Sequence, residues 1–171
     1  MDKNCVPYPR KSLYLLLTIP MIAIYVAIAA LLWKANQTVF AIYLTLFIVV
    51  AVSQSYVCVY WQCPYVGKFA PCVGGFCLPS SQLARLFKNT KRSESLYNIA
   101  VTLAFAAFLG IIVLPIYFLY QQGSVYLLGY LGIVLIYASS FLWWICPVCG
   151  TRHVCPGGQA STKLRERLIR K

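Results

Sequence analysis

Apolar residues along this chain form four long runs, which are separated alternately by very short and by longer polar segments. Each run is as long as the roughly 20 residues that an α-helix needs to cross a bilayer. The connections at 34–38 and 121–124 are so short that each flanking pair of helices is predicted to form an antiparallel hairpin. The predicted spans are 12–33, 39–61, 95–120 and 125–145.

The chain also repeats itself at a constant offset of 83 residues. A Trp-x-Cys-Pro motif occurs at 61–64 and again at 144–147, and each copy is followed by a Cys-x-Gly-Gly motif, at 72–75 and 155–158. The same offset aligns two Ser-Leu-Tyr segments, at 12–14 and 95–97. Internal repeats determine architecture, so the unit here is two apolar helices followed by a cysteine loop.

These patterns predict an all-α, polytopic membrane protein with four transmembrane helices arranged as a tandem two-helix repeat with pseudo-two-fold symmetry. The whole chain, 1–171, forms one membrane domain. The first repeat covers about 12–91 and the second about 95–171. A basic, amphipathic stretch follows each cysteine loop, at 80–88 and 161–170, and each is predicted to be a helix in the membrane interface.

Composition agrees with a membrane protein and excludes an ordinary soluble enzyme. Of the 171 residues, 61% are hydrophobic and only 11% are charged, against about a quarter in soluble domains. The net charge of +12 is expected to act on topology and on the lipid bilayer rather than on nucleic acid, because no basic soluble domain exists to bind it. The residues for a nucleophilic triad or a phosphate-binding loop are absent from the sequence, so whether the protein is an enzyme stays open.

The distribution of positive charge predicts the orientation. Fourteen of the fifteen lysines and arginines lie in the N-terminal tail, the middle loop and the C-terminal tail, and only Lys34 lies on the other side. The positive-inside rule therefore predicts an integral protein of the cytoplasmic membrane. Both termini and both cysteine loops are predicted to lie in the cytoplasm.

All eight cysteines lie in or near the segments predicted to be cytoplasmic. Because the cytosol is normally reducing, metal binding or redox chemistry is favoured over disulfides, with hyperthermophiles as the exception. Cys-x2-Cys is the strongest local signal, since it turns two thiolates toward one ion. The candidate metal ligands are Cys63, Cys72, Cys77, Cys146, Cys149 and Cys155, with His153 as a further candidate.

Two ligand arrangements fit the sequence. In one, the four repeat-equivalent thiols of Cys63, Cys72, Cys146 and Cys155 converge on a single centre. In the other, the first loop and the second loop each hold a metal, the second with His153 or Cys5 as an additional ligand. All-sulfur sets suit zinc or an iron–sulfur cluster, and the sequence does not choose between them. Cys58 is interpreted as a small buried hydrophobe.

The cysteine-proline segments at 76–86 and 143–147 resemble those of the membrane iron–sulfur proteins of nitrate and nitrous-oxide respiration, the NapH and NosR type. The spacing Cys72-x4-Cys77-x-Pro79 differs from the Cys-x3-Cys-Pro typical of that family. The resemblance implies several spans, an iron–sulfur cluster, and electron transfer from quinol or ferredoxin-type donors together with other membrane or cytoplasmic subunits.

Two further functions fit the same residues. A closed zinc site that holds the two halves of a scaffold or assembly protein together needs only four such ligands. A membrane thiol–disulfide oxidoreductase is the other, since the layout is similar to the vitamin K epoxide reductase family. In that reading Cys63 and Cys72 pass electrons to Cys146 and Cys149 through mixed disulfides.

Overall fold

The computed structural model describes residues 10–63, 65–66, 76–87, 89–90, 92–150, 152–153 and 155–169. Within these ranges the chain is helical and contains no strand. Four of the helices are long and apolar enough to cross a membrane, which confirms the predicted all-α class and its four spans. They are α1 (Lys11–Ala35), α2 (Gln37–Tyr60), α4 (Glu94–Gln122) and α5 (Ser124–Ser140), the last continuing through a π-helical turn, Phe141–Ile145, and a 3-10 turn, Cys146–Val148.

Both predicted hairpins are present, and each turn is a single residue. Asn36 joins α1 to α2, and its side-chain oxygen accepts hydrogen bonds from the N–H groups of Thr38 and Val39, at 2.9 and 3.2 Å. It is therefore the N-cap of α2. Gly123 joins α4 to α5 with a φ of +134°, a conformation that a residue with a Cβ rarely adopts.

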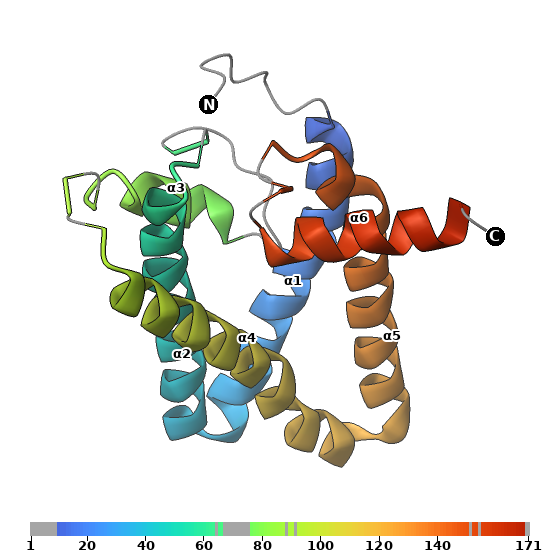
Figure 1. The fold of residues 1–171 in the computed structure, drawn as a ribbon. Coiled ribbons are helices and arrows are strands. Elements are labelled where there is room, and N and C mark those ends of the chain that lie inside the picture. Colours follow the sequence, from blue (N-terminus) through green and yellow to red (C-terminus); the bar gives the residue numbers. More distant parts are fainter. Residues whose placement is uncertain are drawn as a thin grey trace.

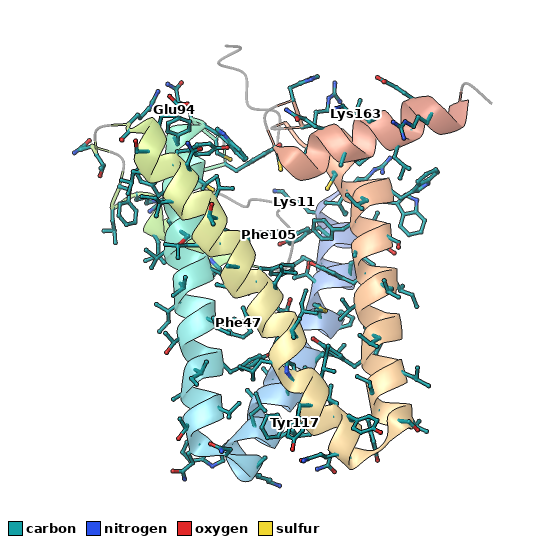
Figure 2. All side chains as sticks on the ribbon, turned by 60° about the horizontal axis from the view of Figure 1, so that its bottom comes forward. Lys11, Phe47, Glu94, Phe105, Tyr117 and Lys163 are labelled. Carbon is teal, nitrogen blue, oxygen red and sulfur yellow. The ribbon has the colours of Figure 1, made fainter. Side chains whose placement is uncertain are left out.

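Two shorter helices lie at the cysteine end of the bundle, α3 (Cys77–Leu83) and α6 (Pro156–Ile169). Figure 1 shows α6 lying across this end, transverse to α5. Lys11, Glu94 and Lys163 lie at this same end and Tyr117 at the opposite one (Figure 2). The first interfacial helix was predicted over 80–88. The corresponding helix, α3, begins earlier, at Cys77, and ends at Leu83. It packs against α2, and Ser80 is among its buried residues.

The most extensive helix contact is between α2 and α4. Gly110 of α4 allows the close approach, because a Cβ at this position would lie only 3.0 Å from Cδ1 of Leu46 on α2. In a membrane, apolar helices gain no hydrophobic free energy by moving from lipid into contact with one another. Close van der Waals packing against small residues therefore holds them together. The equivalent pair in the repeat, α1 and α5, touches over a much shorter stretch, so the pseudo-two-fold symmetry of the whole bundle stays a prediction.

Phe76, just before α3, enters the centre of the bundle. Its ring lies 5.2 Å from that of Phe47, 6.1 Å from that of Tyr25 and 6.3 Å from that of Phe108, between centroids, so it touches α2, α1 and α4 together. Phe47 is thirteen residues from the end of α2, roughly 20 Å along the helix axis. The middle segment was predicted to be a cytoplasmic loop, and the packing of Phe76 among the spans was not predicted. Backbone can enter at such depth where protein surrounds it.

We expect Phe76→Ala to destabilise the protein by about 3–5 kcal/mol, because it removes a ring that three helices contact and leaves a cavity. Denaturant titration in a mild detergent, followed by circular dichroism, measures the effect. Phe105→Ala is the matched control: Phe105 is a phenylalanine of α4, but 63% of its surface is exposed, so its loss should change stability by less than about 0.5 kcal/mol. Equal effects of the two substitutions would contradict a central role for Phe76.

Candidate functional site

The second and the fourth span both end with a hydrogen bond that reaches back five residues. The N–H of Cys63 donates to the carbonyl of Cys58 at 2.9 Å. The N–H of Cys146 donates to the carbonyl of Phe141. The backbones differ, because Gln62 has a φ of +50° and its N–H donates to the carbonyl of Val59, as in a Schellman C-cap, whereas Phe141–Ile145 is a right-handed π-helical turn. Cys63 and Cys146, which are 83 residues apart, thus share the bond but not the conformation.

The resemblance of the two ends continues for one more turn. The N–H of Val66 donates to the carbonyl of Cys63, and the N–H of Cys149 to that of Cys146, both at 3.2 Å. Cys63 is 9% exposed and Cys146 is 7% exposed. Each half of the molecule therefore has one buried cysteine at the end of a span.

The first of these thiols has a second cysteine beside it. A hydrogen bond with the thiol of Cys58, together with burial, raises the pKa of the Cys63 thiol well above its usual range. Without a bound cation, Cys63 is thus a thiol rather than a thiolate at neutral pH, and a metal would have to displace its proton. Cys58 is buried, as predicted, but it is also a partner of a candidate ligand. The two cysteines are five residues apart, the same separation that the backbone hydrogen bond from Cys63 to Cys58 spans, and this spacing was not singled out in the sequence.

In the second loop two thiols border the same small space. A Cβ at Gly157, in the first turn of α6, would lie 3.8 Å from the sulfur of Cys146 and 3.9 Å from the sulfur of Cys155. The absence of a side chain at Gly157 leaves room between these two sulfurs. Cys149 is half-buried on the turn between them in sequence. The five cysteines whose side chains are described are not joined by disulfides: Cys58, Cys63, Cys146, Cys149 and Cys155.

Arg152 holds this loop against α6. Its Nη1 donates to the carbonyl of Pro147 at 3.0 Å, which fixes the turn that carries Cys146. A Cβ at Gly158 would lie 2.6 Å from the carbonyl oxygen of Arg152 and would clash with that backbone. Only glycine at 158 therefore lets α6 approach the loop so closely.

His153 does not join the thiols. It is exposed, and its Nε2 accepts a hydrogen bond from Nε of Arg152 at 3.2 Å. Its carbonyl accepts a second bond from the side chain of Gln159 at 2.8 Å. In the described part of the chain, no three histidine, cysteine or acidic side chains lie close enough together to hold one metal ion. Cys58 lies beside Cys63, and Cys146 and Cys155 border one space, while Cys5, Cys72 and the side chain of Cys77 lie outside the described residues.

The two cysteine loops are in direct contact through Tyr65, a residue that sequence reasoning did not single out. Tyr65 is buried, and its hydroxyl oxygen accepts a hydrogen bond from the N–H of Gly150 at 3.2 Å. Gly150 directly follows Cys149, so the first loop touches the Cys-x2-Cys turn of the second. A second bond, from Nη1 of Arg10 to the carbonyl of Trp144 at 2.7 Å, ties the start of α1 to the same region.

Comparison of this chain with models of protein families, with curated proteins and with solved structures finds no match.

Gly157 and Gly158 are neighbours with opposite expected behaviour. We expect Gly158→Ala to push α6 off the loop and to raise the rate at which a small maleimide alkylates Cys146 in detergent by tenfold or more, the effect of about 1.4 kcal/mol of local destabilisation. Gly157→Ala adds its methyl group at ordinary contact distance and should leave this rate unchanged. Mass spectrometry of the alkylated peptide measures both, and similar rates in the two variants would refute the packing described here.

Proposed function

We propose that this integral membrane protein binds one metal centre through thiolates of both cysteine loops, and that this centre is an iron–sulfur cluster that transfers electrons within a larger membrane complex. The observation that carries the proposal is the hydrogen bond between Tyr65 and Gly150, because it holds the first cysteine loop against the second. A shared centre needs this proximity. A separate metal in each loop does not.

The donor chemistry supports a shared, all-sulfur site. Cys63 and Cys146 are both buried at the end of a span, and Cys155 adds a third sulfur beside Cys146. Because no three candidate ligands lie together among the described residues, a four-ligand site has to take a sulfur from outside them, and Cys72 is the repeat-equivalent of Cys155. Partly buried thiolates at the membrane boundary suit an iron–sulfur cluster, because its reduction potential depends on burial and on N–H···S hydrogen bonds.

A second candidate function rests on the contact between Cys58 and Cys63. Two hydrogen-bonded thiols can be oxidised to a disulfide by exchange with a partner disulfide, which receives both electrons and both protons as two thiols. This is the chemistry of a membrane thiol–disulfide oxidoreductase. It uses Cys58, which the metal centre does not need.

Analysis of iron, zinc and acid-labile sulfide in protein purified anaerobically in detergent, with its visible spectrum, tests the proposal. We expect iron with sulfide and absorbance near ~400 nm, and we expect Cys63→Ser and Cys146→Ser to abolish both. Cys58→Ser is the matched control and should keep the metal. Stoichiometric zinc without colour would replace electron transfer by a structural zinc site. Protein without metal in which Cys58→Ser blocks oxidation by a small disulfide would instead favour thiol–disulfide exchange.

We propose further that the cysteine end faces the cytoplasm. This end carries Arg10, Lys11, Arg152 and Lys163. Lys34 lies in the last turn of α1, at the opposite end of the bundle. Intact cells treated with a membrane-impermeant maleimide test the orientation. The native protein should not be labelled despite its eight cysteines, Lys34→Cys should be labelled, and Lys163→Cys should react only after permeabilisation. Labelling of the native protein in sealed cells would reverse the assignment.

A further inference from the structure

A hollow of about 400 Å³ opens between α1 and α5, at the end of the bundle opposite the cysteines. Its volume lies in the range of ~300–1,000 Å³ typical of sites for small molecules. Its walls are apolar residues of the two helices, with Leu119 near the end of α4. The lining residues include Ala27 and Leu31 of α1 and Gly129 and Ile133 of α5.

The hollow is present because the second copy of the repeat lacks a side chain that the first copy has. In the tight α2–α4 interface, Leu46 fills the space above Gly110. The offset of 83 residues makes Gly129 the counterpart of Leu46, and Ala27 the counterpart of Gly110. Ala27 and Gly129 both line the hollow, and a Cβ at Gly129 would meet no atom within 4 Å. The same pair of positions that packs α2 against α4 thus leaves α1 and α5 apart.

A second hollow continues the first toward the membrane boundary. It is lined by Lys34 and Gln122 together with small apolar residues, and the two hollows share Leu31. Ala27, Leu31 and Lys34 follow one another at helical spacing, so they form one stripe along α1. The two hollows together form a trough. It is apolar along the first hollow and ends at the ammonium group of Lys34 and the amide group of Gln122.

We propose that this trough binds an anionic phospholipid, with one acyl chain beside Gly129 and the phosphate near Lys34. The apolar length lies within the membrane-spanning part of α1 and α5, where lipid chains are the available apolar molecules. The single cation at its mouth selects a negatively charged headgroup. The position at the end of the bundle remote from the cysteines fits a structural lipid that fills the α1–α5 interface, and it fits a carrier of electrons to the cysteine loops poorly. The inference is independent of the proposed metal centre.

Gly129→Leu tests the trough by adding the side chain that Leu46 supplies in the first copy. In native mass spectrometry of delipidated protein titrated with phosphatidylglycerol, we expect the wild type to retain one lipid and Gly129→Leu to bind it at least about tenfold more weakly, since the added side chain occupies the chain site. Gly132→Leu is the matched control. It makes the same change on the same helix at a position that is equally open but does not line the trough, so binding should be unchanged. Both substitutions raise helix propensity, and circular dichroism of the two variants in detergent checks that each remains folded.

Lys34→Gln tests the headgroup separately. The wild type should prefer phosphatidylglycerol to phosphatidylcholine by about fivefold, the effect expected of one lysine beside an anionic headgroup, and Lys34→Gln should abolish the preference while Lys34→Arg keeps it. Equal binding of the two lipids by the wild type, or equal binding by Gly129→Leu and Gly132→Leu, would overturn the proposal. A metal-free preparation serves as well as a loaded one, so failure of the metal proposal would leave this result intact.

Discussion

The arrangement of the bundle depends on the insertion of one aromatic ring among three helices. Phe76 meets Tyr25, Phe47 and Phe108 inside the membrane domain, where apolar helices gain no free energy by leaving lipid and must be held by packing. Phe76 follows the first cysteine loop in sequence, and Cys63 and Tyr65 precede it. Cys63 and Tyr65 are buried at the end of α2, and Phe76 is buried among the helices.

Hydrophobic length and the internal repeat were sufficient to predict the four spans and both hairpins. Each span boundary agrees with its prediction to within a few residues, because Trp, Asn36 and Gly123 mark the ends chemically. The entry of Phe76 into the bundle was not predictable. A single aromatic residue in a loop of glycines and prolines has no periodicity, and only the packing of three helices around it reveals its depth.

The ligand set of the candidate site stays a prediction, and the contacts around it were not predictable. Of the candidate ligands that the sequence singled out, Cys63 and Cys146 are buried at the ends of two spans. The hydrogen bond from the N–H of Cys63 to the carbonyl of Cys58 belongs to a C-cap in which Gln62 has a φ of +50°, and a left-handed glutamine has no signature in composition. Tyr65 was also missed, because its role is to accept a backbone hydrogen bond from the other half of the chain, and such a partner is visible only in three dimensions.

Duplication has a steric consequence at the centre of the molecule. Tyr25 and Phe108 occupy equivalent positions in the two copies, and the one ring of Phe76 lies against both. A space that two equivalent positions share has room for one occupant. Two separate, identical half-chains would each present the same loop residue to it, and one of the two would be excluded. Joining the copies in one chain removes that competition, so the first loop is free to supply the core and the second, with Gln159 at the corresponding position, to form the surface helix α6.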